Sequence, residues 1–304
     1  MQESEIIHAY EDGAAHSFAR AKELGMFCSY ELPIAHWSTV RCLLAEEAER
    51  FPMWEPTLES TREPEEKLFR KEEELSLADC ISCPSEFVLQ SIPEKIRKKT
   101  PCLIAPFGSP IDMGNTPTRY AYRKSGKLKL LFVGSMSQRK GLADLFEAMK
   151  LINSKNVSLS ILGRPSLPMS FYRKVYPHFE YLSPRSNNEV RRVMDEHDVL
   201  VLPSIIEGRA LVQQEALACG LPLIVTQNTG GVDLIEEEKT GFIVPIRKPA
   251  EIAEKIDWFG RNLKKLDVMS EFCRNKARNY QWTDYARSII SFCLRTRSNF
   301  TDIP

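Results

Sequence analysis

The chain has 304 residues, of which 43% are hydrophobic, and its 41 basic side chains balance its 41 acidic ones. A chain of this length can bury two ordinary hydrophobic cores, and a neutral balance creates no overall field that would attract nucleic acid or an anionic membrane. We therefore expect two domains, no nucleic-acid partner, and a small molecule or a protein as the binding partner.

The N-terminal sequence and the cysteines indicate a reduced, cytoplasmic protein. The first ten residues, MQESEIIHAY, lack the basic and then apolar profile of a secretory signal, and no apolar run approaches the roughly 20 residues of a membrane span. The eight cysteines are scattered, and only Cys80 and Cys83 have a spacing similar to metal or redox motifs. Because no second pair follows them, we predict buried, reduced thiols and no metal site.

The first 125 residues predict an irregular α/β domain. Four short apolar runs are typical of strands, and a helix between the first two is closed by Gly25. The charged segment 62–79 most simply predicts a solvated helix face. The stretch 106–118 is rich in proline and glycine and suits a connection between domains, so we place the first domain at residues 1–122. The predicted strands lie within EIIHAY, MFCSYEL, CISCPS and CLIAPFG.

From residue 127 onward, strand-like apolar runs alternate with helix-like stretches. Alternation of this kind predicts a parallel sheet covered by helices on both faces. In such sheets ligands lie at the carboxyl ends of the strands, where loops meet helix N-termini. We therefore place a second domain at residues 123–281 and expect its site at the strand ends. The predicted strands are KLKLLFVG, VSLSILG, FEYLS, VLVLPS, LPLIVT and GFIVP.

The helix predicted after VLVLPS begins near Arg209 to Leu211 and offers a place for an anion. At such a junction free backbone N–H groups, and the positive end of the helix dipole, point out of the carboxyl edge of the sheet. Gly208 permits close backbone approach, and the small side chain of Ala210 leaves room above the helix end. The junction therefore predicts a phosphate site.

Two carboxylates flank this junction, Glu207 in the loop and Glu215 one turn inside the helix. A carboxylate beside a phosphate is unfavourable unless it accepts hydrogen bonds, and sugar hydroxyls are suitable donors. At the first strand–helix junction, FVGSMSQRKG, Arg139 and Lys140 are suited to neutralising a diphosphate. Taken alone, these two cations are explained equally well as ordinary surface charges.

Several blocks of the chain resemble family 4 glycosyltransferases, which have the two-domain GT-B fold. The most specific block is EGRALVQQEALACGLPLIVT, which looks like the E-x7-E signature region, followed by GGVDLIEEEKTGFIVP. Weaker matches are LLFVGSMSQRKGL, LADCISCPSEFV, APFGSPID and YQWTDYARSII, so the resemblance extends from about residue 5 to residue 293. It implies two Rossmann-like domains with parallel sheets, and a closing helix within residues 282–304 that crosses back onto the first domain.

The resemblance implies an enzyme that transfers a sugar from a nucleotide-diphosphate donor with retention of configuration, without a metal or other cofactor. By position, Glu207 would contact hydroxyls of the donor sugar, Glu215 the ribose, and Lys140 the leaving diphosphate. The implied donor-binding residues are Gly134, Ser135, Arg139, Lys140, Glu207, Gly208, Arg209, Ala210, Leu211 and Glu215, with the amides of Ala210 and Leu211 facing the diphosphate. The candidate catalytic residues are Glu207, Lys140 and His36.

Two substitutions depart from the family pattern. Ser135 stands where family members often have an arginine after Gly134, and Arg139 is the candidate substitute from four residues on. Family members also often have a histidine at the end of the strand that MFCSYEL resembles. Pro33 takes that place here, and His36 lies three residues later. We keep His36 as a candidate for catalysis or substrate contact, beside the simpler interpretation as a packed or loop histidine.

The first domain is expected to be incomplete. Full members of the family begin with a strand, a glycine-rich loop and further βα units before a segment like IIHAYEDGAAHSFARAKELG, whereas this chain starts there. A trimmed sheet with an exposed edge, a need for a partner, or a misassigned start codon would each explain the difference. The alternative function is a non-catalytic or partner-dependent subunit that binds a nucleotide sugar, and a nucleotide-sugar epimerase is a weaker third.

The base, the sugar and the acceptor are not specified by these motifs. A UDP- or GDP-linked sugar is the expected donor substrate, and the acceptor is a saccharide, a lipid or a small molecule. Trp37 and Trp54 would suit an acceptor site or a peripheral membrane contact, although a place in the core is the preferred interpretation. Oligomerisation is left open.

Overall fold

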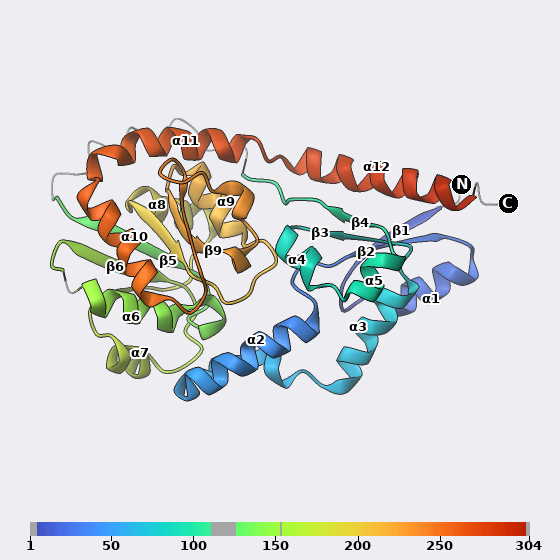
Figure 1. Cartoon of the computed structure of the whole chain (residues 1–304), viewed down its shortest axis with the longest axis horizontal. Helices are drawn as coiled ribbons and strands as arrows, with labels where there is room; N and C mark the ends of the chain where they lie inside the picture. The colour runs from blue at the N-terminus through green and yellow to red at the C-terminus, as the bar shows by residue number, and fades with distance from the viewer. Residues whose placement is uncertain (1–4, 111–125, 153, 302–304) are drawn as a thin grey trace.

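The computed structural model of the chain describes residues 5–110, 126–152 and 154–301 and contains two parallel β-sheets, one in each domain (Figure 1). The two domains lie side by side along the long axis of the molecule, and the last helix runs back along the first domain (Figure 1). The predicted α/β fold with two parallel sheets is therefore confirmed.

The first domain contains a four-stranded sheet in the order β1-β2-β3-β4, with all neighbours parallel. Strands β2 and β3 are buried along their whole length, because elements cover both faces of the sheet. Within the described residues β1 pairs only with β2 and forms one edge of the sheet. The elements are β1 (Ile6–Tyr10), α1 (Ala15–Glu23), β2 (Phe27–Glu31), α2 (Trp37–Arg50), η1 (Pro52–Thr57), η2 (Glu59–Arg62), α3 (Glu65–Leu77), β3 (Cys80–Cys83), α4 (Glu86–Ser91), α5 (Glu94–Lys99) and β4 (Cys102–Ile104).

The second domain contains a six-stranded sheet in the order β10-β9-β8-β5-β6-β7. The chain moves outward from β5 to β7 and then returns to β8, so β5 and β8 are neighbours at the point where the order reverses. Doubly wound sheets bind ligands at such a reversal. The elements are β5 (Leu128–Val133), η4 (Gln138–Lys140), α6 (Leu142–Ile152), β6 (Val157–Leu162), α7 (Met169–Val175), β7 (Glu180–Leu182), α8 (Asn187–Asp195), β8 (Val199–Leu202), α9 (Leu211–Ala218), β9 (Leu223–Thr226), η5 (Gln227–Thr229), η6 (Val232–Leu234), β10 (Gly241–Val244), α10 (Pro249–Arg261), η7 (Leu263–Lys265) and α11 (Leu266–Arg278).

Helix α12 (Trp282–Thr301) leaves the second domain and covers one face of the first sheet (Figure 1). Its buried residues Ile289 and Cys293 pack against Phe27 and Cys80 of that sheet. The sulfur atoms of Cys80 and Cys293 are 3.9 Å apart, and all eight cysteines are free thiols. None of the helices in the described ranges is long and apolar enough to cross a membrane.

Residues 37–62, comprising α2, η1 and η2, form what we call the strap, which reaches from the first domain to the second (Figure 1). Trp54 of the strap is buried in the core of the second domain, with its ring centroid 5.1 Å from that of Phe171 and 5.6 Å from that of Tyr172. The preferred interpretation of Trp54 as a core residue is confirmed, but the core belongs to the other domain.

Helix α3 has the solvated face that its charges predicted, at residues such as Glu65, Glu66 and Glu73, but Lys71 and Glu74 lie on its buried face. The Glu74 carboxylate accepts hydrogen bonds from the amides of Asp12 (2.7 Å) and Ala14 (2.8 Å). Helix α1 has no side-chain cap of its own, so Glu74 satisfies N–H groups at its start from a distant part of the chain. Charge density along a helix thus predicts its solvated face but does not reveal a long-range capping role such as that of Glu74.

Candidate functional site

The candidate site lies where the loops after β5 and β8 leave the carboxyl edge of the second sheet. The Glu207 carboxylate accepts contacts from the guanidinium of Arg139 at 2.8 Å and from Lys140 Nζ at 2.6 Å. The amide of Ile205 donates to the carbonyl of Arg139 at 2.9 Å, which ties the two loops together through the backbone as well. Two junctions that are far apart in sequence thus form one cluster of charges.

Glycines in the first loop make room for this arrangement. A Cβ on Gly134 would lie 3.4 Å from Cε of Lys140, so the lysine stem passes over the bare backbone. Gly141 has a φ of 72° and ends the short turn that carries Lys140, and a Cβ there would overlap the carbonyl of Pro203. The loop sequence therefore sets where the ammonium group of Lys140 lies.

The charges of the cluster are mostly shielded from water. The side chains of Glu207 and Lys140 are 10% and 12% exposed, and that of Arg139 is 28% exposed. Burial lowers the pKa of Lys140, the Glu207 charge opposes that shift, and the Arg139 charge adds to it. Two cations share one carboxylate, so the cluster has a local excess of positive charge beside a strand end. Such a surplus attracts an anion with more than one negative charge.

The start of helix α9 offers fewer free amides than the sequence predicted. The amide of Ala210 already donates to the carbonyl of Thr229 at 3.2 Å. Leu211, the first residue of the helix, is exposed, and no hydrogen bond is recorded from its amide within the described chain. Of the two amides predicted to face a diphosphate, that of Leu211 is the one left free for it.

Glu215 lies one turn into α9 and is only half-buried. Burial raises the pKa of its carboxyl group, and no hydrogen bond or ion pair to its side chain is recorded in the described residues. A carboxylate that is partly removed from water without a protein donor can accept from ligand hydroxyls. The predicted contact of Glu215 with a ribose stays a prediction.

Arg209 was predicted among the donor-binding residues, but its side chain is committed elsewhere. Both guanidinium NH groups bind the Asp233 carboxylate, at 2.7 and 3.0 Å, and Nε donates to Gln214 at 2.8 Å. The side chain has no solvent exposure. Only the backbone of Arg209 therefore belongs to the loop between the two carboxylates.

His36 serves as the N-cap of α2 rather than joining Glu207 and Lys140. Its Nδ1 atom accepts from the amide of Ser38 at 3.3 Å, and its Nε2 lies 3.3 Å from the Glu72 carboxylate. Burial lowers the pKa of His36, against the effect of the Glu72 charge. The residue is 1% exposed, which fits the simpler interpretation of a packed histidine.

The first domain closes directly over the loop that carries Glu207. A Cβ on Gly208 would overlap the carbonyl of Pro33, so only a glycine fits there. Ser85, at the start of α4, donates from its hydroxyl to the carbonyl of Gly208 at 2.7 Å. Ser135, by contrast, contacts only its own loop through Ser137, with 3.2 Å between the hydroxyl oxygens.

One buried amide that sequence reasoning missed anchors the loop before Lys140. The side chain of Gln138 donates to Glu47 at 2.6 Å and to Asp144 at 2.7 Å, and its backbone amide donates to the hydroxyl of Thr57 at 3.1 Å. Glu47 and Thr57 belong to the strap. No local pattern distinguishes such a glutamine from an ordinary loop residue, because its strap partners Glu47 and Thr57 are more than 80 positions away in sequence.

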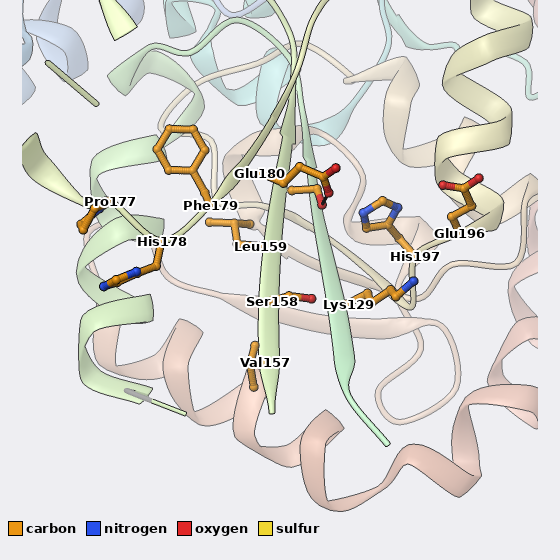
Figure 2. A pocket seen from close by; sticks show the side chains of 11 residues that line it. Lys129, Val157, Ser158, Leu159, Pro177, His178, Phe179, Glu180, Glu196 and His197 are labelled. Carbon is orange, nitrogen blue, oxygen red and sulfur yellow. Dashed lines mark hydrogen bonds between the residues drawn. The ribbon is translucent and has the colours of Figure 1, made fainter. Parts of the chain in front are cut away.

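A separate groove of about 570 Å³ lies at the amino ends of β5 to β8, the opposite edge of the sheet from the candidate site (Figure 2). Lys129, His178, Glu180 and His197 line it, and Figure 2 shows the His178 ring pointing away from the other three side chains. Both histidines therefore lie at the edge of the sheet opposite the Glu207 cluster. In the described part of the chain no group of three or more histidine, cysteine, aspartate or glutamate side chains could hold a metal.

Comparison with known sequences supports the glycosyltransferase family. Residues 127–262 match the sequence model of the family described as "Glycosyl transferases group 1", a segment that is less than half of the chain. An uncharacterized glycosyltransferase of Methanocaldococcus jannaschii is 25% identical over 173 residues, which cover 53% of this chain and 43% of that protein. The D-inositol 3-phosphate glycosyltransferase of Jonesia denitrificans is 27% identical over 225 residues, covering 67% of this chain and 52% of that protein.

Solved structures support the GT-B fold across nearly the whole chain. Sucrose-phosphate synthase from Thermosynechococcus elongatus matches with a TM-score of 0.75 at 17% identity, covering 98% of this chain and 74% of that one. The Anabaena protein HepE in complex with UDP matches with a TM-score of 0.71 at 14% identity, covering 95% and 78%. The chain spans about half the length of the curated relatives it matches. The fold is therefore that of GT-B glycosyltransferases.

Proposed function

We propose that the protein is a retaining glycosyltransferase of family 4, which transfers a sugar from a UDP- or GDP-linked donor to a saccharide, lipid or small-molecule acceptor. The observation that carries the proposal is the pairing of Glu207 with Arg139 and Lys140 across two neighbouring strand ends. The E-x7-E spacing of Glu207 and Glu215 and the match of residues 127–262 to group 1 glycosyltransferases support it.

The ion pairs of Glu207 define how a donor would bind. A diphosphate carries more negative charge than one carboxylate and would draw Lys140 and Arg139 toward its oxygens. Glu207 would then be free to accept hydrogen bonds from hydroxyls of the donor sugar. The free amide of Leu211 would add a donor to the phosphate, and Glu215 would accept from the ribose.

Catalysis in this arrangement would come mainly from charge stabilisation. The bond between the sugar carbon and the diphosphate oxygen breaks, and a new bond forms to an acceptor oxygen on the same face of the sugar. Negative charge would develop on the departing diphosphate, beside Lys140 and Arg139, whose side chains are largely shielded from water. These two cations would supply the charge without a bound metal.

Substitution of Glu207 by Gln tests the proposal. The change keeps the side-chain shape but removes the charge, so sugar transfer should fall by about 100-fold or more, the loss typical for one electrostatic group in an active site. Binding of UDP or GDP should remain, because Lys140 and Arg139 are freed rather than removed. The assay is release of nucleoside diphosphate from UDP- and GDP-sugars with saccharide and lipid acceptors, alongside calorimetric titration of UDP and GDP.

A matched control is Glu236→Gln. Glu236 also contacts two cations, Lys276 at 3.1 Å and Lys239 at 3.4 Å, but it lies on the exposed loop before β10. This variant should keep both transfer and nucleotide binding. Unchanged turnover in Glu207→Gln, or an equal loss in the control, would remove the central claim.

The second candidate function is a subunit that binds a nucleotide sugar without turning it over. The position of His36 favours it, because the single candidate catalytic residue from the first domain is the cap of α2 and is paired with Glu72. Under this alternative UDP or GDP binds, but no sugar is transferred unless another chain is added.

A further inference from the structure

The chain passes between the domains at two places, and these segments touch each other. The amide of Ser109 donates to the carbonyl of Tyr280 at 2.9 Å, and the rings of Phe107 and Trp282 stack with centroids 5.9 Å apart. A Cβ on Gly108 would overlap Trp282, so the two segments are in direct backbone contact. We call residues 106–110 and 279–282 the pivot.

Arg209 connects the pivot to the loop that carries Glu207. Its guanidinium forms the two-pronged pair with Asp233, donates to the carbonyl of Gly230 at 3.1 Å, and lies 4.9 Å from the ring centroid of Tyr280. The Tyr280 hydroxyl in turn donates to the carbonyl of Asp233 at 3.3 Å. The side chain of Arg209, which lies between Glu207 and Glu215 in the sequence, therefore contacts Tyr280 in the second segment of the pivot.

Gln214 connects the same arginine to the first segment of the pivot. Its Oε1 atom accepts from Arg209, while its side-chain nitrogen donates to the carbonyl of Phe107 at 2.6 Å and contacts the Ser109 hydroxyl at 3.1 Å. Gln214 neighbours Glu215 in α9. Both segments of the pivot are thus joined to the site loop and its helix through one buried guanidinium.

A simple stabilising role does not account well for this arrangement. Removing a charge from water costs several kcal/mol, and an apolar side chain of similar volume often fills such a place at no loss of stability. A planar guanidinium with fixed donors holds several partners in one geometry, which a flexible apolar chain cannot do. The network therefore specifies the relative position of the pivot and the loop.

We infer that Arg209 is a positioning residue that couples the arrangement of the two domains at the pivot to the shape of the loop at 207–211. The inference rests on the proposed function, because it deepens the role of that loop. When a bound nucleotide restricts the conformations of the loop, Arg209 restricts those of the pivot as well. In the opposite direction, a pivot in this conformation holds Glu207 and the Leu211 amide in place. By thermodynamic reciprocity the coupling acts in both directions.

Hydrogen exchange with UDP and GDP as probes tests the inference. In the wild-type chain, saturating nucleotide should slow amide exchange both in the loop at 207–211 and in the pivot. In Arg209→Met, nucleotide should still bind and protect the loop, but protection of the pivot should fall by about fivefold or more, the lower bound of typical coupling between sites. If Arg209→Met folds poorly, Asp233→Asn replaces it in the experiment. This variant removes the charge that pairs with Arg209, at a partly exposed position, and should give the same loss of pivot protection.

The matched control is Arg173→Met. Arg173 also lies over an aromatic ring, 3.9 Å from the centroid of Phe179, and donates to the carbonyl of Pro177 at 2.8 Å, but it is in α7 away from the pivot. This variant should keep pivot protection. Wild-type protein that binds nucleotide without a change at the pivot, or an Asp233→Asn variant with the full response, overturns the inference. Wild-type protein that binds neither nucleotide overturns the proposed function and this inference with it.

Discussion

The strap and the pivot join the same two domains by different means. The strap is a noncovalent contact in which Trp54 enters the core of the second domain and Gln138 is held by strap residues. The pivot contains residues 106–110 and 279–282, which lie on the two chain connections, and it depends on polar contacts around Arg209. Each region reaches one of the two loops of the candidate site, the strap through Gln138 to the loop of Lys140 and the pivot through Arg209 to the loop of Glu207.

The two loops of the site, although they contact each other, are therefore anchored by different parts of the chain. The apolar contact of Trp54 resists separation of the domains, whereas the directional hydrogen bonds around Gln138 and around Arg209 fix how the two loops are oriented. Stability and function should therefore respond differently to changes in the two regions. Four variants in and near these regions test whether stability and nucleotide binding respond separately.

The largest expected effect is on stability, from Trp54→Ala in the strap. Loss of the indole from the aromatic cluster with Phe146, Phe171 and Tyr172 should lower the free energy of unfolding by about 3–5 kcal/mol. Chemical denaturation measures it. Trp258→Ala is the control, because Trp258 belongs to the second domain alone, and it should leave nucleotide affinity unchanged. Trp54→Ala should weaken nucleotide affinity, because it disturbs the strap. Equal affinities in the two variants would contradict an influence of the strap on the site.

Gln138→Leu should break the polar link between the strap and the site. Removal of the amide leaves the buried Glu47 and Asp144 carboxylates without one donor each, which should cost up to about 3 kcal/mol of stability. Because Gln138 is two residues from Lys140, titration calorimetry should also show weaker binding of UDP or GDP. A stability loss with unchanged nucleotide affinity would mean that the strap does not position Lys140.

A buried charge cluster of Glu11, Glu63 and Lys71, next to the end of the strap, should make stability depend on pH. Glu63, just after η2, pairs with Lys71, which also faces Glu11 at 3.5 Å. Burial raises the pKa of Glu11 from 4.5 to about 7, against the effect of Lys71. The folded state therefore binds more protons than the unfolded state between these values, so stability falls as pH rises through this window.

Glu11→Gln isolates this contribution. The wild-type protein should lose on the order of 2 kcal/mol relative to the variant between about pH 4.5 and pH 7, because the glutamine does not titrate. Urea denaturation at a series of pH values gives the difference. Parallel stability curves for the two proteins would show that Glu11 does not titrate in this range.

The smallest effect is expected in the pivot, from Tyr280→Phe. The change removes the hydroxyl, with its contacts to Asp233 and Arg209, and leaves the ring beneath Arg209, so stability should fall by about 0.5–1.5 kcal/mol. Pivot protection in hydrogen exchange should nevertheless decrease when nucleotide is bound. A Tyr280→Phe variant that loses as much stability as Trp54→Ala would erase the contrast between the two regions.

Much of the second domain could be predicted from the sequence. Each of its six strands was expected from its apolar run, because local periodicity and glycine punctuation are enough to define a βα unit. The proximity of Glu207 to Lys140 followed from placing both at carboxyl ends of strands in one parallel sheet. The strap could not be predicted in the same way, since Trp54 packs against Phe146 and Phe171, which lie 92 and 117 positions further along the chain.

Sequence patterns alone predicted the parallel sheet of the second domain, the junctions at which Arg139, Lys140, Glu207 and Glu215 lie, and the glycines that let backbones approach, whereas the parallel sheet of the first domain was implied by the family resemblance. These features depend on local spacing and on the geometry of single residues. Only the tertiary structure decided that Arg209 points to Asp233, that His36 caps a helix and that Glu74 is buried. The physical reason is that a charged side chain takes the nearest partners the fold provides, and those partners come from distant segments.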